Sequence, residues 1–189
     1  MALTFPNNPE SFRAFFEELA GLHKAIQHSV EENRIRFFEI QYLDFPYSDW
    51  DMDEWDKSVG KNIKLGPNDQ AMALLGFETA DGHQAGFEVQ ASVLFFMLPQ
   101  KVNSNAAFFA EKNRIFTATY NTCSDFRAVI RKYFRSNTQG YILPETFRTT
   151  HVRMPGNTNT MYGTRLDFTY GFYQTIAPNN DNWMEDPLA

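Results

Sequence analysis

Residues 71–98, AMALLGFETADGHQAGFEVQASVLFFML, decide the fold of this chain. Two long apolar runs, 71–80 and 86–98, flank Asp81-Gly82, a dipeptide that suits the type I′ turn of a β-hairpin. Through most of the second run apolar and polar residues alternate, which is the period of a strand with one buried face. We therefore predict two long antiparallel strands with one face in the core.

The far end of the second strand is apolar on both faces. The face that carries Glu88, Gln90 and Ser92 becomes apolar at Leu94 and Phe96. A strand face that met water would stay polar along its whole length. We therefore expect this end of the sheet to be covered by a helix or by another subunit.

The N-terminal segment has the pattern of an amphipathic helix. Asn8 can cap it, Pro9 suits the first helical position, and Glu10 lies near the positive end of the helix dipole. Apolar residues then recur at steps of three and four as far as Val30. We predict a helix of about five turns, followed by a strand over residues 35–43.

The segment after the hairpin keeps helical spacing but contains a weak stretch. Ser104 or its neighbour Asn103 can cap the helix at its start. The run 117–122, TATYNT, has low helix propensity. We therefore expect a break there, and a second helix that begins at a capping box of Thr122 and Asp125.

Two further strands follow, over 145–154 and 162–175, and PGNTNT (155–160) between them has turn composition. Short hairpin connections imply antiparallel pairing. We predict an α+β fold, a single antiparallel (mixed) twisted sheet of about five strands, with an N-terminal helix and one or two helices between strands three and four packed on one face. Residues 1–176 form this single domain, and residues 177–189 form an acidic C-terminal tail.

Composition argues against several classes of function. The chain of 189 residues has 17 basic and 23 acidic side chains, and the net charge of −6 disfavours binding to a nucleic-acid backbone. No apolar window is long enough to span a bilayer, and the N-terminus does not read as a secretory signal. A single cysteine permits no internal disulfide. We expect a soluble protein made in a cytoplasm, with no membrane partner, and its nineteen phenylalanines predict a phenylalanine-rich core.

No pattern in the sequence indicates catalytic or metal chemistry. Phosphate-binding loops, dinucleotide-binding turns and nucleophile elbows are absent, and the four histidines lack metal-ligand spacing. Asp49, Asp51 and Asp53 imitate the first ligands of a calcium loop. Glu54 and Gly60, however, stand where such a loop needs its glycine and its bidentate glutamate. We predict a non-enzymatic protein with no catalytic residue, no cofactor and no metal ion.

Acidic and basic residues are separated along the chain. The stretch SDWDMDEWD (48–56) combines five acids with two tryptophans, whereas residues 126–153 hold six bases and one acid. Arg127, Arg131 and Arg135 are spaced four apart, as on one face of a helix. An exposed turn and a solvated helix face are the simplest interpretations of these two segments.

Opposite charges on one chain can also pair between subunits. A head-to-tail arrangement of such subunits closes into a ring when the rotation permits. An aromatic anchor beside a fixed charged patch is typical of contact surfaces. We predict a subunit contact formed by Asp49, Trp50, Asp51, Asp53, Glu54, Trp55, Arg127, Arg131 and Arg135.

The predicted order of elements over residues 9–175, in a cysteine-poor chain without catalytic motifs, resembles the tail-terminator and tail-completion proteins of tailed bacteriophages. The aromatic segment 106–120 and the insertion around the tryptophans go beyond that pattern. The resemblance implies a virion protein. It implies a homo-oligomeric ring, commonly of roughly six subunits, that caps the tail tube and joins it to neighbouring tail or neck proteins.

A second interpretation belongs to another class of function. A helix-backed antiparallel sheet can curl around a small apolar ligand. The phenylalanine-rich faces of residues 87–97 and 166–172 would then line a pocket in a monomeric or dimeric protein.

Overall fold

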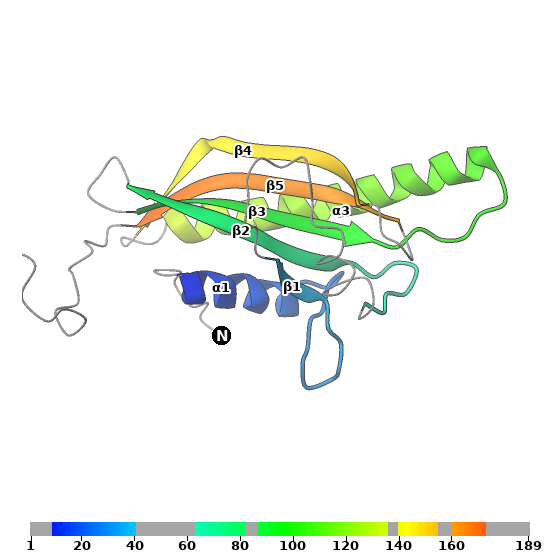
Figure 1. Cartoon of the computed structure of the whole chain (residues 1–189), viewed down its shortest axis with the longest axis horizontal. Coiled ribbons are helices and arrows are strands. Elements are labelled where there is room, and N and C mark those ends of the chain that lie inside the picture. The colour runs from blue at the N-terminus through cyan, green and yellow to red at the C-terminus, as the bar shows by residue number, and fades with distance from the viewer. Residues whose placement is uncertain (1–8, 41–62, 82–86, 136–139, 155–159, 173–189) are drawn as a thin grey trace, which may run out of the picture.

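The computed structural model describes residues 9–40, 63–81, 87–135, 140–154 and 160–172 (Figure 1). These residues form an α+β fold, as predicted. Its elements in chain order are α1 (Pro9–Leu22), β1 (Phe37–Ile40), β2 (Ala71–Asp81), β3 (Phe87–Met97), α3 (Asn105–Arg135), β4 (Gly140–Met154) and β5 (Met161–Phe172). The predicted C-terminal tail, 177–189, lies outside the described residues.

The strands form one open five-stranded sheet in the order β1-β2-β3-β5-β4. The β2–β3 and β4–β5 pairs are antiparallel hairpins, and β3 and β5 are antiparallel neighbours. β1 lies parallel to β2, so the sheet is mixed. The predicted five-stranded sheet and both predicted hairpins are therefore confirmed.

The first hairpin has a longer connection than a two-residue turn. Asp81 still belongs to β2 and lies opposite Phe87 of β3. Five residues, 82–86, therefore join the strands instead of the dipeptide Asp81-Gly82, and they lie outside the described residues.

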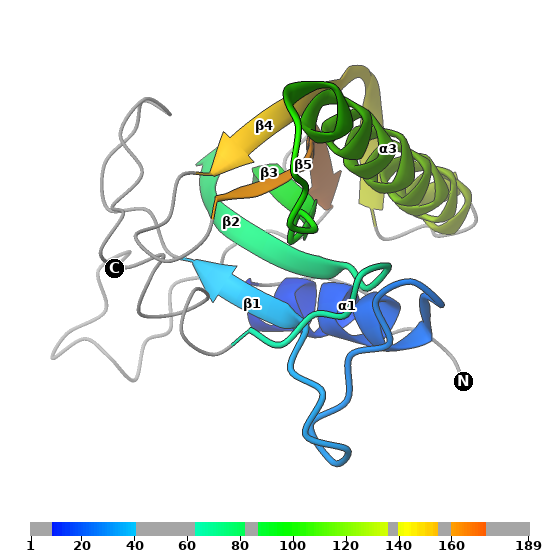
Figure 2. The same cartoon turned by 90° about the vertical axis from the view of Figure 1, so that its right-hand side faces the viewer.

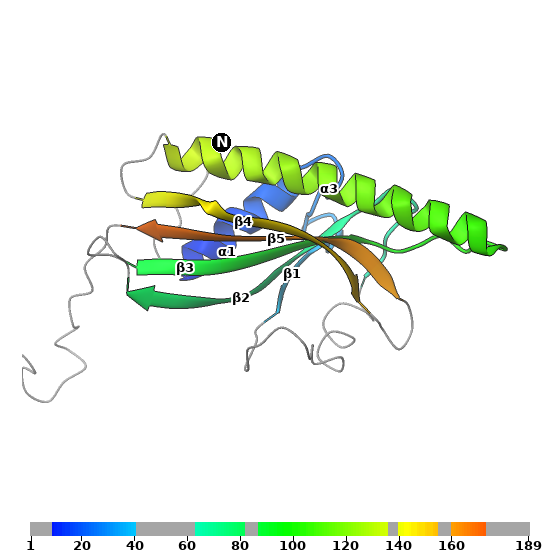
Figure 3. The ribbon, with the colours of Figure 1, turned by 90° about the horizontal axis from the view of Figure 1, so that it is seen from above.

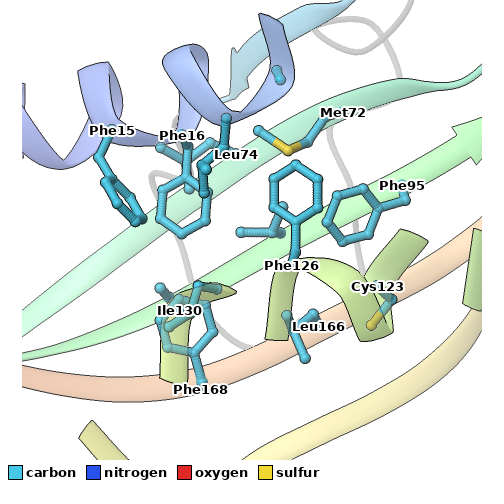
Figure 4. Packing of buried hydrophobic residues seen from close by; sticks show 14 of the residues in the cluster. Phe15, Phe16, Met72, Leu74, Phe95, Cys123, Phe126, Ile130, Leu166 and Phe168 are labelled. Carbon is cyan, nitrogen blue, oxygen red and sulfur yellow. The ribbon is translucent and has the colours of Figure 1, made fainter. Parts of the chain in front are cut away.

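Both helices pack on the same face of the sheet, which curves around them (Figure 2). Figure 4 shows phenylalanine rings of α1, α3 and the strands pointing toward one another. The ring centroids of Phe95 and Phe126 are 4.7 Å apart, and those of Phe16 and Phe168 are 6.1 Å apart. The predicted phenylalanine-rich core therefore lies between the sheet and the two helices.

The apolar end of the opposite face is buried, as predicted. Leu94 and Phe96 are fully buried there, in a cluster that includes Phe38. Among the described residues, Ile63 and Leu65, which lead into β2, pack against this cluster. Chain segments therefore contribute to this cover, where we expected a helix or a second subunit.

The first helix is shorter than predicted, because α1 ends at Leu22. The chain then turns, and Gln27 and Asn33 have positive φ angles of 53° and 51°. Ile26 lies beyond the end of the helix but is fully buried in the core. This burial explains why an apolar residue still occurs at the helical spacing there. The following strand, β1, covers residues 37–40 of the predicted 35–43, and residues 41–43 lie outside the described part.

The predicted break in the second helix is wrong, because α3 is one continuous helix of 31 residues. The Thr119 hydroxyl donates to the carbonyl of Ile115 at 2.9 Å and lies 2.8 Å from the hydroxyl of Thr164 in β5. The Thr122 hydroxyl donates to the carbonyl of Ala118, so it does not cap a new helix. Pairing with the sheet outweighs the weak local propensity of this stretch.

A buried carboxylate fixes the start of α3. Glu111 accepts hydrogen bonds from the backbone N–H of Gln100 at 2.9 Å and from the guanidinium of Arg114 at 2.8 Å. Arg114 also donates to the carbonyl of Pro67 at 3.0 Å. The hydrogen bond from Arg114 is the largest of the effects that lower the pKa of Glu111.

Two glycines of β5 give a matched test of packing. A Cβ added at Gly163 would lie 2.0 Å from the backbone oxygen of Phe95, whereas the atoms nearest to one added at Gly171 belong to the side chain of Tyr141. Backbone of the central strand cannot move as a side chain can. We predict that Gly163→Ala lowers the free energy of unfolding by about 3 kcal/mol and Gly171→Ala by about 1 kcal/mol. Urea denaturation measures both, and an equal loss would contradict the assigned β3–β5 register.

The Glu111 carboxylate should make stability depend on pH. Because its pKa is lowered from the ordinary 4.5, the ion contributes stability above that value and loses it as pH falls through the folded pKa. We predict that Glu111→Gln is less stable than the wild type at pH 7 and that this difference shrinks below pH about 4. Thermal melts between these pH values measure it, and a constant difference would exclude the linkage.

Candidate assembly surface

Two predicted contact residues share one aromatic platform. Arg127 and Arg131 lie one turn apart on α3, and their guanidinium carbons are 5.0 and 5.2 Å from the ring centroid of Phe147 in β4. Phe147 is buried and stacks on Phe168 at 5.4 Å. The i, i+4 spacing brings both arginines to the platform, and the core holds the platform rigid.

Both guanidinium carbons lie over the face of the Phe147 ring. An arginine has five N–H donors, and all of them lie in the guanidinium plane. No described carboxylate forms an ion pair with either arginine, and the Nε of Arg127 is buried without a hydrogen-bond partner. Planar carboxylates are the groups that best match such in-plane donors.

The arginines elsewhere in the described chain are arranged differently. Five of them pair with an acid at 3.3 Å or less, and these are Arg13, Arg34, Arg36, Arg114 and Arg165. The described arginine side chains without an ion pair all lie on the C-terminal part of α3 or on the edge strand β4, and we call them the basic edge: Arg127, Arg131, Arg148 and Arg153. Guanidinium groups without an ion pair are therefore concentrated at one edge of the sheet.

The structure describes the side chains of two residues of the predicted subunit contact. It brings Arg127 and Arg131 together, while Arg135 is the last residue of α3 and its side chain lies outside the described part. The acidic half also lies outside the described residues, namely Asp49, Trp50, Asp51, Asp53, Glu54 and Trp55. The pairing of the two halves therefore remains a prediction.

Sequence reasoning missed the aromatic partners on this surface. Phe147 was not singled out, although it shares a strand face with His151. His151 is exposed but stacks on Phe116 of α3 at 4.5 Å, and its Nδ1 lies 3.2 Å from the Thr164 hydroxyl. The available signal in the sequence was an aromatic residue on the same strand face as His151. This signal could be interpreted only once α3 was known to pack over β4.

The described residues give little support to covalent or metal chemistry. Cys123 is buried, with its sulfur 3.8 Å from the Thr149 hydroxyl, and burial raises the pKa of its thiol. A raised pKa disfavours the thiolate that a nucleophile requires. Within the described ranges, no three His, Cys, Asp or Glu side chains come together as a metal site.

A scan against protein-family models and a search of curated proteins gave no match to this chain. None of the helices in the described ranges has the length and apolar character to span a membrane.

The unpaired arginines should contribute less to stability than the paired ones. We predict that Arg127→Met with Arg131→Met lowers the free energy of unfolding by about 1 kcal/mol, because only stacking on the platform is lost. Arg36→Met should cost about 3 kcal/mol, because Arg36 bonds to Asp69 at 2.5 Å and to the carbonyl of Ile26 at 2.7 Å. Urea denaturation compares them. A larger loss in the double variant would mean that the basic edge serves the fold.

Proposed function

We propose that this chain is a non-enzymatic assembly protein that forms a homo-oligomeric ring, of the tail-terminator or tail-completion type, at the tail–neck junction of a tailed-phage virion. The basic edge is the observation that carries the proposal. Its guanidinium groups have no described carboxylate partner, in a chain whose net charge is −6. The acidic stretch 48–56 of a neighbouring subunit supplies the complementary charge.

The strand order supports a head-to-tail contact. The basic edge adjoins β4, at one edge of the sheet, whereas β1 forms the opposite edge. The chain leaves β1 at Ile40, eight residues before Ser48, the first residue of the acidic stretch. Along the chain, the acidic stretch therefore follows the strand at the edge opposite to the basic edge. Heterologous contacts between such edges are the kind that close into rings.

In the proposed contact, charged residues would orient the neighbouring subunit and tryptophan side chains would bind it. Arginines already held over a buried ring lose little side-chain entropy when they bind carboxylates. The acids of 48–56 would orient the neighbour, and Trp50 or Trp55 would supply apolar area at the centre of the contact. Each buried aromatic anchor of this kind is worth about 2 kcal/mol or more.

The alternative function, a small-ligand pocket, gains no support from the described packing. The faces that would line it are filled by helix side chains. Phe95 packs on Phe126 at 4.7 Å, and Tyr170 stacks on Phe12 at 4.8 Å. These rings occupy the space beside the sheet where an apolar ligand would have to lie.

Charge reversal tests the contact. We predict that Asp49→Lys, Asp51→Lys and Asp53→Lys together prevent assembly while the subunit stays folded, and that Arg127→Glu with Arg131→Glu does the same. An equimolar mixture of the two variants should recover assembly with alternating subunits, because the unchanged acids of one variant face the unchanged arginines of the other and the new lysines face the new glutamates. Native mass spectrometry and light scattering report the subunit multiples, and circular dichroism reports folding.

Reversal of Glu31 and Glu32 to Lys provides the control, because these exposed acids precede β1 and lie outside the proposed contact. Normal rings from the triple Asp variant would contradict the proposed contact. A monomer at every concentration that carries a small bound mass would instead favour the ligand-binding function. Mass spectrometry of purified virions tests the virion role directly.

A further inference from the structure

The N-terminal end of α3 extends beyond the sheet (Figures 1 and 3). Ser104 caps it, since its hydroxyl accepts a hydrogen bond from the N–H of Ala107 at 3.2 Å. The ring of Phe108 lies 6.1 Å from that of Tyr162, at the start of β5. The first turns of α3 therefore lie beside and beyond the start of β5, and these turns still carry aromatic side chains.

This end of α3 exposes apolar side chains around a cation. Phe109 is 61% exposed and Val102 is 37% exposed. The Nζ of Lys112 lies 5.6 Å from the Phe108 centroid, 5.4 Å from the Phe109 centroid and 5.6 Å from the Tyr162 centroid. We call Val102, Phe108, Phe109 and Lys112 the overhang surface. Large exposed aromatic residues grouped in this way are typical of binding surfaces.

The charge around the overhang surface is positive. Lys101 is exposed beside it, and the first turn of α3 contains no acid. Glu111 is the one acid between residues 99 and 116, and it is buried against Arg114. The positive end of the helix dipole adds to this field. A matching partner therefore combines apolar side chains with carboxylates and lacks bases.

We propose that the overhang surface binds the segment 176–189 of a second copy of this chain. The segment reads IAPNNDNWMEDPLA and has no basic residue. Trp183 and Met184 would pack against Phe109, while a carboxylate pairs with Lys112. The available carboxylates are Asp181, Glu185 and Asp186.

The course of β5 favours a second copy over the same chain. β5 starts beside the overhang surface and ends at Phe172, at the opposite end of the sheet. The ten steps from Tyr162 to Phe172 cover about 33 Å. The eleven steps from Phe172 to Trp183 span at most about 40 Å when fully extended. Trp183 of the same chain would reach Phe109 only at full stretch, and this limit on reach favours a second copy as the source of the segment.

The contact at the overhang surface adds a second subunit contact to the proposed ring. It rests on the proposed function, because this contact and the one at the basic edge both require head-to-tail neighbours. It uses different residues from the basic edge, however. The two contacts can therefore be broken separately.

Photo-crosslinking in the full chain identifies the occupant. A photoreactive benzoylphenylalanine replaces Phe109, and copies with natural and with heavy nitrogen isotopes are mixed before irradiation. We expect cross-linked peptides that join a light copy to a heavy copy and that map to residues 176–189. A cross-link within one copy, or to any other segment, would overturn the inference.

Substitutions measure the same contact without a label. Phe109→Ser and Trp183→Ala should each weaken self-association about tenfold, and the double variant should be no weaker than either one, because both changes break one contact. Val129→Ser is the control, since Val129 is also exposed on α3 but lies far from the overhang surface. Strictly additive effects of Phe109→Ser and Trp183→Ala would overturn the inference.

The two proposals fail in different ways. If the charge-reversed Asp variant keeps its rings and the mixed-isotope cross-link persists, the arginine contact is wrong and the overhang contact stands. If charge reversal dissolves the rings but the cross-link maps elsewhere, the overhang contact alone is wrong.

Discussion

Burial of β3 on both of its faces is the constraint on which the rest of the structure depends. β3 has neighbours on both sides in the sheet, and its residues from Ala91 to Met97 are at most 3% exposed. Val93 and Phe95 point toward the helices, whereas Leu94 and Phe96 point into the cluster on the other face. A strand buried in this way stabilises the fold only if both faces are covered. The two helices and the segment before β2 contribute this cover.

The sequence predicts those parts of the fold that depend on local pattern. The period of β3, the antiparallel pairing of β4 with β5, and the cap at Ser104 all have structural counterparts. The continuity of α3 was not predictable, because the Thr119 hydroxyl finds its partner on Thr164, 45 residues away. Only the folded chain brings such a partner near.

On the candidate surface, too, the sequence predicts the features that depend on local spacing but not those that depend on the folded chain. Spacing alone places Arg127 and Arg131 on one helix face, and this much follows from the sequence. Their platform, Phe147, and the absence of a described carboxylate partner depend on how α3 packs over β4. Arginine is also suited to stabilise folds, as Arg36 does inside this one. The structure distinguishes the two uses, since the guanidinium of Arg36 bonds to Asp69 and to the carbonyl of Ile26, whereas those of Arg127 and Arg131 have no carboxylate partner among the described residues.

The unbroken course of α3 has a mechanical consequence. Phe109 and Arg127 are 18 residues apart on one helix, which fixes their separation along its axis at about 27 Å. A broken helix could have adjusted one of these positions independently of the other. A continuous helix instead holds the two positions at a fixed separation. Neighbours bound at both positions would therefore have a fixed angle between them, and that angle sets the number of subunits in a closed ring.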